Sequence, residues 1–281
     1  VTLSTGLIKS RNIVTVKLLM DIGVRYAMKY ALAMGITSPI FPNLSMALGS
    51  SGLSLLELTS AYSIFPNMGV LVPPCFIKKI VDNRGNVLEE NPPPDPRIYF
   101  TGHARPEVLS LLQEKETRPA GNEDVRQLAM MEKNASTAPR IPEQFAPNEI
   151  SFKSGLESAL VFDRRADLQP GPRQVLSPAT AYIMTHLLEH AVDRGTGWRV
   201  KALGRPAAGK TGTTNNFVDA WFIGFTPVLT TGVWVGFDDE RPLGEKETGS
   251  RAASPLWLEF MQKAAAGHAA EEFPVPQEVV F

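Results

Sequence analysis

The sequence predicts an α+β domain in which helices flank an antiparallel sheet, and three observations predict it. Apolar residues recur at helical spacing near the start of the chain, over residues 13–34 and 54–65. Short β-type runs separated by turn residues follow one another between residues 207 and 237, as in hairpin-linked strands. Helical patterns lie on both sides of these strands, at residues 178–195 and 255–266, so helices are expected to pack on the sheet.

Composition limits the class of protein. The chain has 281 residues, 43% of them hydrophobic, which is enough to bury the core of one large domain or two small ones. Lys and Arg number 28 and Asp and Glu number 29, so the net charge of −1 offers no positive field, and no nucleic-acid partner is expected. The single cysteine, Cys75, excludes an internal disulfide and a multi-cysteine metal site.

The start of the chain contains neither a membrane span nor a secretion signal. Lys9, Lys17 and Asp21 interrupt the early apolar runs, so no segment is expected to cross a bilayer. The chain begins with Val1 rather than Met and lacks the pattern of a signal peptide. We therefore expect an internal piece of a longer protein, whose targeting signal or anchor lies elsewhere.

Local patterns predict the elements of the first part of the chain. A helical hairpin is expected over residues 13–21 and 24–34, because apolar residues recur there at helical spacing. Ser54 and Glu57 have the spacing of a capping box, so a third helix is expected to begin at this point. β-type residues on both sides of a turn at residues 82–86 predict a short β-hairpin.

Prolines concentrate in the middle of the chain. Residues 91–178 hold 12 of the 23 prolines with little periodicity, so an insertion or mobile loop region is expected at about residues 91–176. Ser177 and Pro178 are typical of a helix start, and that helix is expected to run to Gly195. The remaining expected elements are strands of an antiparallel meander at residues 207–213, 220–225 and 232–237, and a final helix at about 255–266.

The first of these strands carries a Lys-Thr-Gly triplet at Lys210, Thr211 and Gly212, followed by Thr213. Lys210 would place a fixed cation beside a hydroxyl nucleophile, and the hydroxyls of Thr211 and Thr213 would hold a substrate carboxylate. Gly212 would let a substrate backbone approach the strand closely. An isolated triplet of this kind is more often an ordinary strand with a surface lysine.

A second motif, Ser10-Arg11-Asn12, lies just before the first predicted helix. A serine at such a position is ordinarily a helix cap. With the triplet at Lys210 downstream, however, Ser10 and Asn12 resemble the SxN element that accompanies SxxK and KTG in penicillin-binding proteins and β-lactamases. Two of these three elements are therefore present, in the expected order.

Further segments extend this match along the chain, among them Leu48-Gly49, Ala61-Tyr62, Arg194-Gly195-Thr196-Gly197, Asp219-Ala220-Trp221-Phe222 and Val233-Trp234-Val235-Gly236. The sequence thus resembles the transpeptidase domain of class A penicillin-binding proteins, the bifunctional peptidoglycan synthases. The resemblance implies the penicillin-recognising serine transpeptidase or β-lactamase-like fold, here incomplete. Residues 1–281 would form the C-terminal part of that domain, and the activity implied is a D,D-transpeptidase.

The resemblance also implies roles for individual residues. Ser10 would relay a proton to the leaving amine, Asn12 would bind the substrate amide, and Lys210 would orient Ser10. Thr211, Gly212 and Thr213 would form the substrate-binding strand, with the threonines on the terminal carboxylate and the Thr213 amide in the oxyanion hole. The implied ligands are peptidoglycan stem peptides and β-lactam antibiotics, and no cofactor or metal is expected.

The sequence departs from the family at the nucleophile. The family's active-site serine is the first residue of SxxK, and no serine in this chain has a lysine three positions later. We therefore expect an upstream segment of the same protein to carry SxxK, and this chain alone not to be acylated. The resemblance places the parent protein on the periplasmic side of a bacterial inner membrane, with an N-terminal membrane anchor and a glycosyltransferase domain.

Two alternatives remain open from the sequence. His186 to His190 fits HxxEH, the inverted zinc-protease motif, although the same face of the predicted helix is also an ordinary solvated surface. A non-catalytic binding module of the same fold is the second alternative. The presence of Ser10, Asn12 and Lys210 weighs against it, because a pure scaffold has no physical need of all three.

Overall fold

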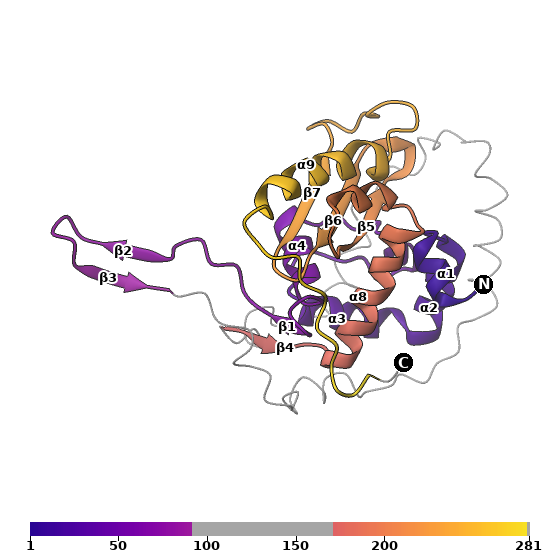
Figure 1. Cartoon of the computed structure of the whole chain (residues 1–281). Coiled ribbons are helices and arrows are strands. Elements are labelled where there is room, and N and C mark those ends of the chain that lie inside the picture. The colour runs from indigo at the N-terminus through magenta and orange to yellow at the C-terminus, as the bar shows by residue number, and fades with distance from the viewer. Residues whose placement is uncertain (92–170, 280–281) are drawn as a thin grey trace, which may run out of the picture. The chain divides into compact units, whose positions relative to one another are not determined.

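A three-stranded antiparallel sheet organises the part of the chain that the structure describes (Figure 1). The structure is a computed structural model that describes residues 1–91 and 171–279, and these residues belong to one compact unit. The strands are β5 (Ala208–Thr213), β6 (Ala220–Phe225) and β7 (Thr230–Val235), which lie in the order β5-β6-β7. The predicted α+β class and the predicted antiparallel meander are confirmed.

Strand β5 is an edge strand, and its register with β6 is regular over all six of its residues. Because side chains alternate between the faces of a sheet, Ala208, Lys210 and Gly212 share one face. Thr211 and Thr213 lie on the other face. The alternation therefore separates the lysine of the triplet from its two threonines.

Helices pack on both faces of the sheet. Helix α4 (Leu55–Ser63) lies against one face, where a Cβ at Gly232 of β7 would meet side-chain atoms of Leu55 and Thr59. Helix α9 (Ser254–Ala264) covers the opposite face. Three further helical segments lie next to these elements. Helix α8 (Pro178–Asp193) lies beside β5, η4 (Trp198–Leu203) contacts α9, and the π-helical turn η6 (Gly249–Ala253) contacts both β6 and α9.

Two buried clusters hold these layers together. In the first, Ile64 at the end of α4 and Leu188 of α8 are buried together with Phe225 of β6. In the second, Phe222 of β6 meets Trp257 of α9 edge-to-face, with ring centroids 5.3 Å apart. Both aromatic residues are fully buried, and an aromatic pair of this geometry adds about 0.5–1.5 kcal/mol to the area it buries.

The N-terminal segment forms three helices rather than the predicted two. The expected hairpin is confirmed as α2 (Asn12–Ile22) and α3 (Val24–Ala33). A short helix, α1 (Leu3–Ile8), precedes it and was not expected, because six residues are too few to show an apolar periodicity. Thr2 caps α1, and a 3₁₀ turn, η1 (Leu44–Leu48), follows α3.

Helix α4 begins at the predicted capping box, and the Glu57 carboxylate of this box also binds the segment before the helix. The Ser54 hydroxyl accepts from the Glu57 amide at 3.1 Å, and Glu57 accepts from the Ser54 amide at 3.3 Å. The same carboxylate accepts from the amides of Thr37 and Ser38, each at 2.8 Å, and from both hydroxyls. Burial alone would raise the pKa of Glu57, but these hydrogen bonds lower it far below its ordinary range.

The predicted proline-rich region, residues 91–176, lies largely outside the described residues. Its last residues are described and belong to the core: β4 (Arg173–Gln174) pairs antiparallel with β1 (Val70–Leu71), and Val175 is buried. The proline-rich pattern thus extended the expected loop region too far, because a two-residue strand leaves no periodic signal. The Arg173 guanidinium also donates to the Ala33 carbonyl at the end of α3, at 2.9 Å.

The predicted β-hairpin is confirmed as β2 (Lys79–Val81) and β3 (Val87–Glu90), and every residue of both strands is exposed. The Asp82 carboxylate fixes its turn by accepting from the amides of Arg84 and Asn86, each at 2.8 Å.

Among the residues described, no helix is both long and apolar enough to cross a membrane.

Gly69 provides a test of the junction between β1 and β4. Its φ is +90°, and a Cβ there would lie 2.1 Å from the Leu176 carbonyl oxygen. We expect Gly69→Ala to lower the free energy of unfolding by about 3 kcal/mol or more, measured by urea denaturation. Gly85→Ala is the matched control, because Gly85 has φ +84° but open space around its Cα. Equal losses in the two variants would contradict this packing.

Glu57 provides a test of the α4 start. We expect Glu57→Gln to lower the free energy of unfolding at pH 7 by about 1.5–3 kcal/mol, the range for hydrogen bonds to a charged group. Because the folded state lowers this pKa, the stabilisation is present above the ordinary glutamate pKa of about 4.3 and is lost as the pH falls. The denaturation midpoints of the variant and the unmodified protein should therefore differ at pH 7 and approach each other at pH 3. Glu271→Gln, at an exposed site, should leave the midpoint of the unmodified protein unchanged at both pH values.

Candidate active site

The structure brings together two residues that are 200 positions apart. The Nζ atom of Lys210, on β5, donates a close hydrogen bond to the Oγ atom of Ser10. The same ammonium donates to the Thr211 carbonyl at 2.9 Å. Ser10, in the turn between α1 and α2, and Lys210, within β5, were both predicted as site residues, and the fold places them face to face.

Ser10 does not cap α2. Its φ is +49°, which places it in the left-handed region, and the residue at the N-cap position is Arg11, whose side chain makes no capping hydrogen bond. The turn between α1 and α2 is closed by the Ser10 amide, which donates to Leu7, and by the Arg11 amide, which donates to Gly6. The serine is thus turned away from the helix end and toward Lys210.

Close packing fixes this turn against the end of α8. A Cβ at Gly195 would lie 2.4 Å from the Ile8 carbonyl oxygen, so only glycine allows α1 to approach so closely. The Lys9 ammonium donates to the Arg194 carbonyl at 3.1 Å. On the two sides of the turn, Gly6 of α1 lies directly against Val14 of α2. These contacts hold Ser10 at its place beside β5.

Burial changes the charge behaviour of Lys210. Its environment withdraws the ammonium from water and lowers the pKa of the side chain to about 8. Two oxygens, from Ser10 and Thr211, accept hydrogen bonds from the ammonium, as a buried charge requires. Lys210 is therefore a cation at neutral pH that loses its charge within a readily accessible pH range.

The hydroxyls of the two threonines predicted to bind substrate both have partners in the protein. Thr211 Oγ1 lies 2.5 Å from Thr196 Oγ1, and Thr213 Oγ1 accepts from the Gly249 amide at 3.0 Å. Gly212 lies between them under the Trp221 side chain, where a Cβ would come within 3.1 Å. Thr196 and Gly249 had no predicted role, although Thr196 lies in the glycine-flanked segment 194–197.

Asn12, the third residue of the SxN element, is the first residue of α2 and is exposed, as is Ser10.

The loop after β5 is fixed separately by Asp219. Its carboxylate accepts from the Trp234 indole at 2.8 Å, and its amide donates to the Thr214 hydroxyl at 2.7 Å. Asp219 thus anchors the turn that sends the chain back from β5 into β6.

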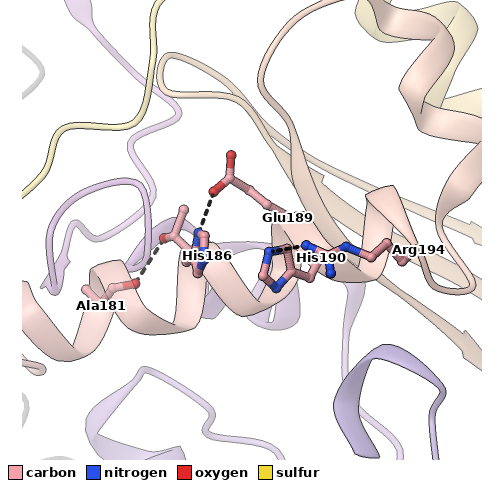
Figure 2. A network of polar contacts seen from close by, with 6 residues as sticks. Ala181, His186, Glu189, His190 and Arg194 are labelled. Atoms are coloured by element: carbon pink, nitrogen blue, oxygen red, sulfur yellow. Dashed lines mark hydrogen bonds and ion pairs between the residues drawn. The ribbon is translucent and has the colours of Figure 1, made fainter. Parts of the chain in front are cut away.

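The candidate zinc motif on α8 has a different arrangement, which Figure 2 shows. His186 Nδ1 lies 3.6 Å from Glu189, and the Arg194 guanidinium donates to His190 Nε2 at 3.0 Å, so that nitrogen is already used. Burial, His186 and Arg194 lower the pKa of His190. No group of three or more His, Cys, Asp or Glu residues in the described chain is placed to hold a metal, and the zinc-peptidase alternative is not favoured.

Comparisons with known proteins identify the family. The family described as "Penicillin binding protein transpeptidase domain" matches residues 1–130. Penicillin-binding protein 1A of Aquifex aeolicus is 31% identical over 99% of this chain, and that of Pseudomonas aeruginosa is 34% identical over 93%. The chain spans 28% and 29% of the lengths of these two relatives.

Solved structures show the same fold. The crystal structure of penicillin-binding protein 1A from Haemophilus influenzae matches with a TM-score of 0.72 and 26% identity, over 100% of this chain and 36% of that one. PonA1 from Mycobacterium tuberculosis in complex with penicillin V matches with a TM-score of 0.63 and 22% identity, over 99% of this chain and 60% of that one. The chain belongs to the transpeptidase-domain family of class A penicillin-binding proteins.

Proposed function

We propose that the protein of which this chain is part is a peptidoglycan D,D-transpeptidase and a target of β-lactam antibiotics. The observation that carries the proposal is the hydrogen bond from Lys210 to Ser10. A partly buried cation held against a serine hydroxyl has no role in stabilising the core, because burial of the ammonium is unfavourable. It is an arrangement suited to moving a proton at that hydroxyl.

The proposed reaction has two steps. A serine attacks the carbonyl of the penultimate D-Ala of a stem peptide, and the bond to the terminal D-Ala breaks as that amine receives a proton through Ser10. An amine of a neighbouring stem then attacks the acyl-enzyme, which forms the new peptide bond and returns the serine. A β-lactam would stop at the acyl stage, because its opened ring keeps the amine in place.

The groups around Lys210 suit a substrate that ends in a carboxylate. The ammonium makes the surroundings of β5 electropositive, and the hydroxyls of Thr211 and Thr213 would hold the carboxylate while Asn12 binds the substrate amide. Gly212, which has no side chain, would let the substrate backbone approach the strand closely between the two threonines. The edge position of β5 would let the Thr213 amide contribute to an oxyanion hole.

The nucleophile is proposed to lie on an upstream segment of the same protein. No serine in the chain has a lysine three positions later, and the relatives are far longer than this chain. We propose that the complete protein also carries a glycosyltransferase domain and a membrane anchor, and that it works on the periplasmic side of the inner membrane. In that setting Ser10 and Lys210 complete a site whose serine the upstream segment supplies.

The labelling of the complete protein by a fluorescent penicillin tests this proposal. We expect Lys210→Ala to reduce the second-order labelling rate by about 10²-fold or more, because the variant removes both the cation and the group that orients Ser10. Lys201→Ala is the control, since Lys201 lies exposed on η4 and makes only a surface ion pair with Asp193. Its labelling should be unchanged.

The chain alone gives the complementary arm of this experiment. Residues 1–281 by themselves should stay unlabelled, and joining them to the upstream segment should restore labelling. Acylation of the isolated chain would contradict an upstream nucleophile. Absence of labelling in the complete protein would instead favour a non-catalytic binding module.

The lowered pKa of Lys210 predicts a pH dependence. Below pH about 8 the side chain is an ammonium, so the attraction for a ligand carboxylate is fully present; above that pH the charge is lost. We expect the affinity of the complete protein for benzylpenicillin to decrease as the pH rises through about 8. The methyl ester, which has no charge to attract, should show no such step, and an identical decrease for both ligands would exclude Lys210 as the cause.

A further inference from the structure

Thr211 is joined to a residue that has no assigned role. Thr196 Oγ1 lies 2.5 Å from Thr211 Oγ1, and the contact is shielded in part from solvent. Thr196 belongs to the turn after α8, whereas Thr211 lies on β5, so the hydrogen bond joins two elements beside the proposed site. Either oxygen is able to donate the proton, and the choice between them has a chemical consequence.

The direction of this hydrogen bond decides what Thr211 offers to a ligand. A hydroxyl has one proton to donate and two lone pairs. If Thr196 donates, Thr211 keeps its own proton for the ligand; if Thr211 donates, it presents only lone pairs. A carboxylate accepts hydrogen bonds and cannot donate them, so only the first arrangement binds it.

Thr213 shows this first arrangement without ambiguity. The Gly249 backbone amide, which can only donate, occupies a lone pair of Thr213 Oγ1 at 3.0 Å. The Thr213 proton is therefore left for another acceptor. Thr211 and Thr213 lie on the same face of β5. If Thr196 donates to Thr211, both threonine hydroxyls therefore have a proton available for a ligand at that face.

The turn that carries Thr196 is firmly placed. A Cβ at Gly195 would lie 2.6 Å from the Ala191 carbonyl oxygen, and the Gly197 amide donates to that same oxygen at 3.0 Å. The Lys9 ammonium binds the neighbouring Arg194 carbonyl. A donor fixed in this way loses little freedom when a ligand binds, so the contact orients Thr211 at small entropic cost.

We propose that Thr196 is a positioning residue that donates to Thr211 and so directs the Thr211 proton toward the carboxylate of a bound peptide or β-lactam. Thr196 does not itself touch the ligand. The inference rests on the proposed function, because it needs a carboxylate ligand at Thr211. It adds a residue outside the SxN and KTG elements to the recognition of that ligand.

The test compares benzylpenicillin with its methyl ester on the complete protein. The readout is the ratio of the two second-order acylation rates, which does not depend on the fraction of protein that is folded. We expect Thr196→Val to lower the ratio about tenfold, since the hydrogen bond to a charged acceptor is stronger than that to a neutral one. Thr196→Ser keeps the hydroxyl and should stay within about twofold of the unmodified protein.

Two further variants separate positioning from general structure. Thr185→Val removes a 3.0 Å hydrogen bond to the Ala181 carbonyl inside α8, far from Thr211 in the chain, and should leave the ratio unchanged. If Thr196 acts through Thr211, the double variant Thr196→Val with Thr211→Val should be no worse than Thr211→Val alone.

Three results would overturn the inference: an unchanged ratio in Thr196→Val, an equal loss for acid and ester, or losses that add fully in the double variant. Failure of the proposed function itself would look different. In that case the unmodified complete protein would not be acylated by either ligand. Acylation of the unmodified protein together with an unaffected Thr196→Val would refute only the role of Thr196.

Discussion

The withdrawal of the Lys210 ammonium from water is the constraint on which the site depends. A buried cation needs acceptors, and those of Lys210 are the Ser10 hydroxyl and the Thr211 carbonyl. One acceptor comes from β5 itself, but the other must be brought from the start of the chain. The placement of the α1–α2 turn, which brings Ser10 to Lys210, is therefore also an electrostatic requirement, and it gives the site both its serine and a lysine of lowered pKa.

The end of α8 connects the parts of this site. Its last turn receives the Lys9 ammonium on one side and approaches α1 so closely that position 195 must be glycine. One residue later, Thr196 reaches Thr211 on β5. The segment 194–197 thus touches both the turn that bears Ser10 and the strand that bears Lys210, although it belongs to neither the SxN nor the KTG element.

Much of the fold was predictable because its signals are local. The capping box at Ser54 and Glu57, the serine cap of α8 and the alternating meander were all confirmed, and each depends on residues within a few positions of one another. The short helix α1 and the pairing of β1 with β4 were missed. Both are too short for a periodic pattern, and the second joins segments separated by the proline-rich region.

The available chemical groups and their order follow from the amino-acid sequence alone: a serine and an asparagine before a helix, and a lysine, two threonines and a glycine on a strand. The contacts of Ser10 with Lys210, of Glu57 with the segment before α4, and of Thr196 with Thr211 became visible only in the folded chain. The physical reason is the separation along the chain of the residues that interact. Periodicity and capping depend on neighbouring residues, whereas a contact between distant positions depends on how whole elements pack, and no local pattern records that packing.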